Sequence, residues 1–159
     1  MSVRMPEPDQ AVLARRARIV ATLRQLVPGE GVIATAREMR AFESDGLTAY
    51  RQLPMVVVLP ETTRQVSEVL KYCHQEGIKV VPRGAGTSLS GGALPLADGV
   101  LLGMAKFNSI REIDFANRAA VVEPGVTNLG ISTAVAHAGF YYAPDPSSQI
   151  ACTIGANIA

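Results

Sequence analysis

A glycine-rich loop directly behind an apolar strand constrains this chain more than any other feature of its sequence. The loop runs from Pro82 to Gly92 and contains four glycines and three hydroxyl residues, directly after the apolar segment Ile78–Val81. Glycine allows a positive φ and the close approach of another backbone or of a ligand. Successive N–H groups of such a loop can point into one concavity, which suits phosphate oxygens. Its position at the end of a strand, where α/β folds bind ligands, favours a phosphate site.

Three other interpretations of this loop compete with a phosphate site. A P-loop for nucleoside triphosphates requires a Gly-Lys-Ser/Thr ending, and the loop contains no lysine. A Rossmann fingerprint requires a third glycine where Leu89 stands and a helix behind it, whereas the next segment has the pattern of a strand. A flexible surface loop would share the composition, but its position behind a buried strand would then have no purpose.

The segments on either side of the loop predict a parallel βαβ unit. Met55–Leu59 is a continuous apolar and β-branched run, which is typical of a strand buried on both faces. The helix expected after Pro60 ends at Gly77, and its apolar residues recur at helical spacing: Val66, Val69, Leu70 and Cys73. The strand Ile78–Val81 follows, so we expect these two strands to be parallel, with a right-handed crossover.

The rest of the chain contains further predicted elements. They are a helix from Pro8 to Leu26, an irregular lead-in over 31–51, strands at Val100–Leu102 and Ala119–Glu123, and a helix from Thr127 to Gly139. The chain then stops in an apolar tail in which we expect no helix or strand to be completed. We therefore divide it into an N-terminal helix with a lead-in segment, 1–53, and a domain at 54–159 that we expect to be incomplete at its C-terminal end.

Composition excludes several classes of protein. Apolar residues make up 48% of the chain and charged residues 18%, which is typical of a folded domain. A net charge of +1 does not indicate the basic surface that binds nucleic acid. The longest aliphatic runs are too short to span a membrane. The basic run Arg15–Arg18 is expected to be the solvated face of a helix rather than a targeting peptide. Two cysteines, Cys73 and Cys152, are too few for a disulfide framework or a zinc site, so we expect no bound metal. We expect both side chains to pack in the interior. With no secretory signal in the sequence, we expect a cytoplasmic protein.

Two long motifs, in the right order, resemble those of a flavoprotein family. Val81–Ala93 resembles the FAD pyrophosphate loop of the vanillyl-alcohol-oxidase-type flavoproteins, which have a PCMH-type FAD-binding domain. Tyr141–Asn157 is similar to a segment of the FAD-linked D subunits of bacterial glycolate oxidases. Between them, Val122–Val126 matches the family's strand-to-turn segment, and Asp45–Arg51 is like the segment that precedes the flavin domain. The resemblance covers nearly the whole chain and is thinnest over the first thirty residues.

The resemblance implies a fold. It is an α+β, PCMH-type FAD-binding fold with two subdomains: a parallel βαβ subdomain near residues 54–104, and the start of a mainly antiparallel second subdomain from about residue 105. In the family the second subdomain continues well past the length of this chain. We therefore expect open strand edges and exposed apolar surface in the chain as given.

The resemblance also implies which residues bind FAD. The pyrophosphate would be wrapped, chiefly through main-chain N–H groups, by Pro82, Arg83, Gly84, Ala85, Gly86, Thr87, Ser88, Gly91 and Gly92. The flavin or its ribityl chain would lie along Pro144, Asp145, Ser147 and Ser148. A second loop, over the isoalloxazine and diphosphate, would be formed by Thr153, Gly155, Ala156 and Asn157.

Some details of this site depart from the family or have more than one interpretation. The family often has two adjacent glycines where this chain has Gly155 and Ala156. The first loop contains no histidine, the residue with which some relatives tether flavin covalently, so we expect non-covalent FAD. Asp145, between two prolines, suits a local turn as well as a flavin contact. Catalytic groups come largely from a later cap domain in the family, so we name no catalytic residue here.

The function implied is oxidation of a small 2-hydroxy acid by hydride transfer to flavin. Glycolate is the first choice because of the match over Tyr141–Cys152, while D-lactate and D-2-hydroxyglutarate relatives share these loops. The family also implies a second flavin subunit and an iron–sulfur subunit as partners, and a cytoplasmic location that is peripheral at the inner membrane through them. The alternative is a truncated flavin-binding fragment or assembly module without catalysis of its own.

Overall fold

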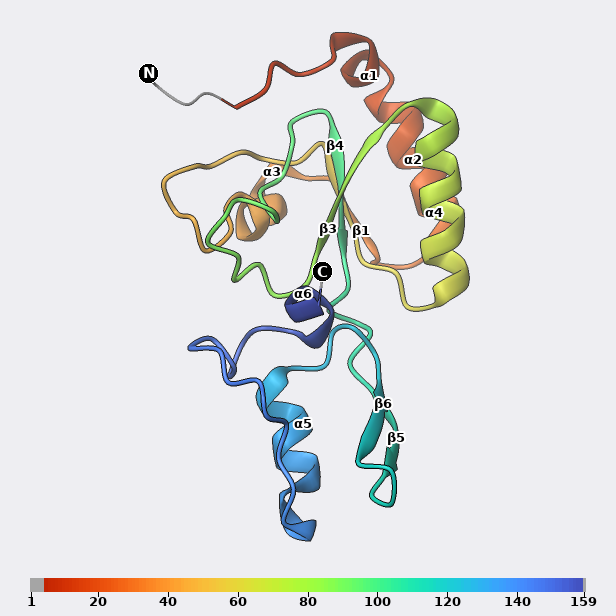
Figure 1. The fold of residues 1–159 in the computed structure, drawn as a ribbon. Coiled ribbons are helices and arrows are strands. Elements are labelled where there is room, and N and C mark those ends of the chain that lie inside the picture. Colours follow the sequence, from red (N-terminus) through yellow and green to blue (C-terminus); the bar gives the residue numbers. More distant parts are fainter. Residues whose placement is uncertain (1–4, 159) are drawn as a thin grey trace.

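A four-stranded sheet with helices on both faces forms the upper part of the molecule in Figure 1. The computed structural model describes residues 5–158. The strand order is β1-β2-β4-β3, in which β2, β4 and β3 run parallel and β1 pairs antiparallel with β2 at one edge. The strands span Val32–Ile33 (β1), Val56–Val58 (β2), Lys79–Arg83 (β3) and Gly99–Gly103 (β4).

Two helices cover one face of this sheet, and a short helical segment covers the other (Figure 1). α2 and α4 lie on the first face, and α3 with the 3-10 turn η1 lies on the second. The structure confirms the predicted helix α4, because Thr62 and Gln65 form a capping box at its start and Gly77 ends it with a φ of 66°. The helices span Gln10–Ala14 (α1), Arg16–Leu26 (α2), Ala36–Met39 (α3), Arg40–Phe42 (η1) and Thr63–Glu76 (α4).

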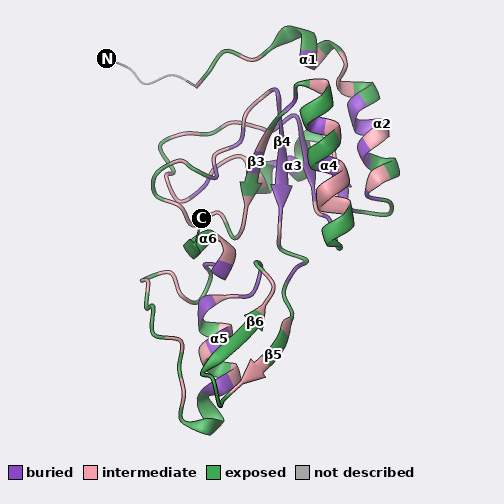
Figure 2. Cartoon of the chain, turned by 45° about the vertical axis from the view of Figure 1, so that its right-hand side comes forward, coloured by how far each residue is buried: buried purple, intermediate pink, exposed green. Residues whose placement is uncertain are grey.

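The alternation of side chains along the central strands divides the core into two layers. The layer beneath α2 and α4 contains Ile19, Leu23, Val56, Val58, Val69, Cys73, Val100 and Leu102. The layer on the other face contains Met39, Val57, Val81 and Leu101. Figure 2 shows β4 buried along its length, as expected for the central strand of a parallel sheet. Cys73 has the predicted packing role, and burial raises the pKa of its thiol to about 11, which makes it a poor nucleophile.

The parallel arrangement of the two predicted strands is confirmed, but they are not neighbours. β2 and β3 each pair with β4, which lies between them. The handedness of the crossover stays a prediction. The lead-in 31–51 contains a strand that the sequence did not predict, β1, because two residues are too few to show an alternating pattern.

The lower part of the molecule consists of a hairpin, a helix and a long return segment (Figure 1). β5 and β6 form an antiparallel hairpin, of which only β6 was predicted. Thr127 caps the predicted helix α5, and Gly139 ends the 3-10 turn behind it with a φ of 77°. The elements span Ile110–Asp114 (β5), Ala119–Val122 (β6), Asn128–Val135 (α5), Ala136–Ala138 (η2) and Ile154–Ile158 (α6).

Two expectations about the ends of the chain are wrong. The C-terminal tail is not irregular: residues Ile154–Ile158 form α6. The N–H groups of Ile154 and Gly155 donate to the Val126 and Pro124 oxygens, and Thr153 and Ala156 pack against Gly84 of the upper part. The basic run Arg15–Arg18 is not wholly a solvated face. Arg16 is half-buried and donates to the main-chain oxygens of Ala34 (2.5 Å) and Met55 (3.1 Å), which joins α2 to the sheet.

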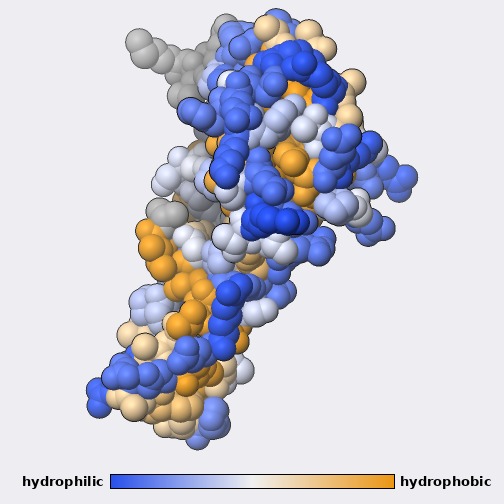
Figure 3. Space-filling view, turned by 90° about the vertical axis from the view of Figure 1, so that its right-hand side faces the viewer, coloured by the Kyte–Doolittle hydropathy of each residue, from blue (hydrophilic) through white to orange (hydrophobic). Residues whose placement is uncertain are grey.

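Apolar surface gathers on the lower part. Figure 3 shows hydrophobic residues spread over the part of the molecule that contains the hairpin and α5, whereas the face of the upper part seen there is mostly hydrophilic. The exposed apolar side chains of this region include Phe115, Val121, Leu129 and Tyr141. Across residues 5–158, no helix has both the length and the apolar character needed to cross a bilayer.

Candidate functional site

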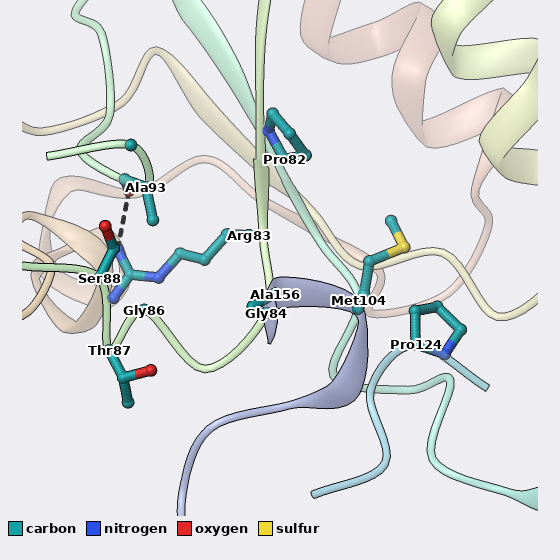
Figure 4. Close-up of a pocket in the computed structure, with 12 residues that line it drawn as sticks. Pro82, Arg83, Gly84, Gly86, Thr87, Ser88, Ala93, Met104, Pro124 and Ala156 are labelled. Carbon is teal, nitrogen blue, oxygen red and sulfur yellow. Dashed lines mark hydrogen bonds between the residues drawn. The ribbon is translucent and has the colours of Figure 1, made fainter. Parts of the chain in front are cut away.

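A cavity of about 420 Å³ lies where the carboxyl ends of β3 and β4 meet the lower part of the molecule (Figure 4). This is the edge at which parallel sheets commonly bind ligands, and the volume is in the range of small-molecule sites. Nine of the residues predicted to bind a cofactor line it: Pro82, Arg83, Gly84, Gly86, Thr87, Ser88, Gly92, Gly155 and Ala156. Three further lining residues were not predicted: Ala93, Met104 and Pro124.

The first loop has the backbone conformation that its glycines allow. Gly86 has a φ of 74° and Gly91 a φ of 76°, values that other residues rarely adopt. Within residues 5–158, the main-chain N–H groups of Ala85, Gly86, Thr87 and Ser88 donate no hydrogen bond to protein. A loop with four successive free donors, held open by glycines, has the properties of an anion-binding nest.

The two sequence motifs meet at Gly84. A side chain on Gly84 would collide with the Thr153 hydroxyl and would lie 3.2 Å from the Ala156 side chain, so only glycine allows this contact. Main-chain hydrogen bonds fix the second motif in place: the Gly155 N–H donates to the Pro124 oxygen at 2.9 Å, and the Ile154 N–H donates to Val126 at 2.8 Å. Residues about 70 positions apart in sequence therefore form opposite sides of one cavity.

A second cavity of about 380 Å³ lies on the other side of Gly84, and its lining includes Ala85, Asn108, Thr127 and Thr153. The Thr153 hydroxyl is buried and has no hydrogen-bond partner among the described residues. A buried hydroxyl without a partner is costly, which makes it a candidate donor or acceptor for a ligand between the two motifs.

The predicted flavin-facing segment lies apart from both cavities. Pro144, Asp145 and Ser147 are exposed and Ser148 is half-buried, and none of the four lines the two cavities; the same holds for Gly91 and Asn157. Asn128, which the sequence did not single out, holds this segment: its Nδ2 donates to the Pro144 oxygen at 3.1 Å and its side chain is fully buried. The sequence gives no pattern from which this role of Asn128, one residue after the helix cap Thr127, could be predicted.

Among residues 5–158, Arg83 is the one charged side chain that lines the first cavity. Its guanidinium donates to the Ala93 oxygen at 3.5 Å (Figure 4). It also donates to the Phe42 oxygen at 3.2 Å and lies over the Phe42 ring at 5.9 Å. Burial lowers the pKa of Arg83 from its ordinary value, and the Asp45 carboxylate partly opposes that shift. The arginine stays charged at neutral pH, because its ordinary pKa is far above 7.

These features fit a dinucleotide with a pyrophosphate. The free N–H groups suit its two negative phosphates, Arg83 adds a positive charge to the lining, and Gly84 and Gly86 allow the backbone to approach closely. The apolar part of the lining, Met104 and Pro124 among others, suits a planar ring system. Across residues 5–158, no group of three or more His, Cys, Asp and Glu residues could hold a metal ion.

Comparison with known proteins finds related sequences. The chain is 54% identical over 144 residues to "Glycolate oxidase subunit GlcD" of Escherichia coli, an alignment that covers 91% of this chain and 29% of the relative. The chain thus spans less than a third of that relative's length.

Solved structures show the same fold. An alkyldihydroxyacetonephosphate synthase superposes with a TM-score of 0.75 at 17% identity and covers 98% of this chain and 30% of its own. A p-cresol methylhydroxylase superposes with a TM-score of 0.70 at 24% identity, covering 87% of this chain and 27% of its own.

The family described as "FAD binding domain" matches residues 54–159. The predicted α+β, PCMH-type fold is therefore confirmed, and the chain belongs to the family of FAD-binding domains.

Proposed function

We propose that this chain is the FAD-binding part of an enzyme that oxidises a small 2-hydroxy acid, with glycolate to glyoxylate as the first choice. The observation that carries the proposal is the cavity that Gly84 and Gly86 of the first motif line together with Gly155 and Ala156 of the second. Gly84 is also in contact with Thr153 and Ala156, so the two motifs meet there. When bound, FAD supplies the hydride acceptor for the substrate's α-carbon. The free N–H groups of Ala85–Ser88 bind the pyrophosphate, and the second motif closes the site from the other side.

The similarity to a protein named as a glycolate oxidase subunit supports the choice of glycolate, and D-lactate is the second substrate that we propose. That name also supports partner subunits. We propose a second flavin subunit and an iron–sulfur subunit, non-covalent FAD, and a cytoplasmic location that is peripheral at the inner membrane through these partners.

A flavin-binding module without catalysis of its own is the second candidate function. The chain spans 29% of the relative's length, and among the described residues the cavity lining contains no Asp, Glu, His, Lys, Tyr or Cys that could take the hydroxyl proton of a substrate. Under this alternative the chain binds FAD and contributes to assembly, while the residues that bind the 2-hydroxy acid lie elsewhere.

FAD titration of the purified chain, read by flavin fluorescence, tests the site. Gly86→Val should weaken binding on the order of a hundredfold, because a side chain at φ 74° is strained and would displace the Arg83 guanidinium. Gly139→Val is the matched control: its φ is 77° and nothing lies within 4 Å of the added Cβ, so it should keep its FAD affinity. Equal affinity of the Gly86→Val variant and wild type would refute the loop assignment. Intact mass after denaturation tests whether the flavin is free of the chain.

Anaerobic mixing of the FAD-loaded chain with glycolate, D-lactate or L-lactate separates the two candidate functions. Loss of the oxidised flavin absorbance with glycolate would support the enzyme, and a faster loss with D-lactate would replace glycolate as the substrate. Tight FAD binding without reduction by any of the three acids would support the binding module instead.

A further inference from the structure

A short segment in front of the family's domain lies against the back of the first loop. We call this segment, Phe42–Leu47, the back wall; it precedes the residues that the FAD-binding family matches, 54–159. The Leu47 N–H donates to the Ser88 oxygen at 3.1 Å. A Cβ on Gly46 would lie 2.8 Å from the main-chain oxygens of both Thr87 and Ser88, so the two backbones touch.

This contact orients the donors of the loop. In a trans peptide the carbonyl and the following N–H point in opposite directions, and the described residues contain no cis peptide. Because the Thr87 and Ser88 oxygens face Gly46, the N–H groups that follow them point away from the back wall. The back wall therefore covers the Thr87 and Ser88 oxygens and leaves the N–H groups of Ser88 and Leu89 facing away from it, where an anion can bind.

Two oppositely charged side chains lie at the junction of the back wall and the loop. Asp45 is 5% exposed; its Oδ1 accepts from the Leu47 N–H at 2.9 Å, and its Oδ2 has no hydrogen-bond partner among the described residues. Arg83 donates to the Phe42 oxygen of the back wall and to the Ala93 oxygen at the far end of the loop. A buried carboxylate is costly without a nearby positive charge. Arg83, which donates to the Phe42 oxygen of the same back wall, carries the charge that acts on Asp45.

We propose that Asp45 and Arg83 are positioning residues that hold the first loop in its binding conformation before the cofactor arrives, with Arg83 bridging the two ends of the loop rather than binding phosphate. The proposal rests on the proposed function in taking FAD as the ligand. Donors that are already in place need no ordering on binding, so the pair raises FAD affinity through preorganisation.

The sign of the effect at Asp45 separates this role from direct phosphate binding. If Arg83 bound the phosphates itself, Asp45→Asn would remove a competing negative charge and strengthen FAD binding. If the pair positions the loop, Asp45→Asn and Arg83→Gln should both weaken binding, the second on the order of tenfold. The double variant should lose no more than Arg83→Gln alone, because the two residues act as one unit. Arg83→Lys should not restore affinity, since one ammonium cannot span both carbonyls.

Amide hydrogen exchange of the FAD-free chain supplies a readout that needs no cofactor. The free donors of the loop exchange readily in any case, so the informative amides are those held by hydrogen bonds: Leu47, which donates to Ser88, and Leu94, which donates to Gly91. The exchange of these two amides, called loop exchange below, should be on the order of tenfold faster in both single variants than in wild type. Arg16→Gln is the matched control, because Arg16 is also half-buried and also donates to two main-chain oxygens, Ala34 and Met55, on the other side of the sheet. It should leave both FAD affinity and loop exchange unchanged.

The outcomes separate the two proposals. Stronger FAD binding by Asp45→Asn, or unchanged loop exchange in both single variants, would overturn the positioning role. Failure of wild type to bind FAD would refute the proposed function, while faster loop exchange in the variants would still support Asp45 and Arg83 as the residues that hold the loop.

Discussion

The upper and lower parts of this molecule differ in how completely their strands are covered. Every residue of β2 and β4 is buried, with helical segments on both faces of their sheet. In the lower hairpin no residue of β5 or β6 is buried, and Val121 is 53% exposed. The lower core cluster contains Val126, Ile131 and Ile154. Strands thus form in both parts, but only the strands of the upper sheet are covered by helices on both faces. We expect the upper part to be the more stable for this reason.

The largest difference should follow from truncating one core residue in each part. Leu101→Ala in β4 should lower the free energy of unfolding by about 3–4 kcal/mol, since its side chain is 1% exposed between two covered faces. Ile131→Ala in α5 should cost about 1–2 kcal/mol, because its cluster is small and can collapse around the gap. Urea unfolding of both variants measures the two losses, and losses of equal size would show that the lower part is packed as well as the upper.

The next effect depends on pH. Burial alone would raise the pKa of Asp98, but hydrogen bonds from Lys79 Nζ (2.7 Å) and the Asp9 N–H (2.8 Å) more than offset it, so its pKa lies below the ordinary value. A lowered folded-state pKa contributes stability above the unfolded value, about 3.9, which is lost as the pH falls through the folded one. Asp98→Asn should therefore cost about 1–2 kcal/mol at pH 7 and less at pH 3.

The control for this prediction lies in the lower part, where Glu123 accepts from Arg111 and from the Ser109 N–H. These bonds also hold the pKa of Glu123 below its ordinary value. Glu123→Gln should lose less stability than Asp98→Asn at pH 7, because Glu123 joins only neighbouring strands of one hairpin. Thermal unfolding across this pH range measures both, and a loss at Asp98 that does not shrink in acid would exclude the charge as its cause.

The smallest effect should come from one substitution made in both parts. Val121→Thr on the open hairpin should change stability by less than about 0.5 kcal/mol, since the side chain already faces solvent. Val57→Thr in β2 should cost about 1–2 kcal/mol, because it places a hydroxyl in a fully buried layer. Thermal unfolding compares the two variants, and a comparable loss at Val121 would mean that another surface covers the hairpin in solution.

The sequence predicted those features that depend on local chemistry. The helix start after Pro60, the glycine stop at Gly77, the buried strand β2 and the strand β4 follow from patterns a few residues long, and all are present. The glycine-rich loop was predicted as an anion site from its position behind a strand, and it lines the cavity with Gly84 and Gly86.

Features that depend on distant contacts were not predictable in this way. β1 is two residues long, and α6 forms where the chain turns back against the upper part. The roles of Asp45 and Asn128 come from packing against segments more than ten residues away, which no spacing in the sequence encodes. The sequence likewise showed no sign that the missing side chain of Gly86 makes room for Arg83 of the same loop.

The contact of Gly84 with Thr153 has a consequence for protein engineering. The exposed turn between β5 and β6, residues 115–118, separates the two motifs along the chain. Cutting the chain in this turn would give two pieces, each carrying one side of the cavity, with the strand pairing of the hairpin as their common interface. Neither piece alone holds a complete pocket, so flavin fluorescence would report their reassembly, as in a split reporter whose signal is the cofactor itself.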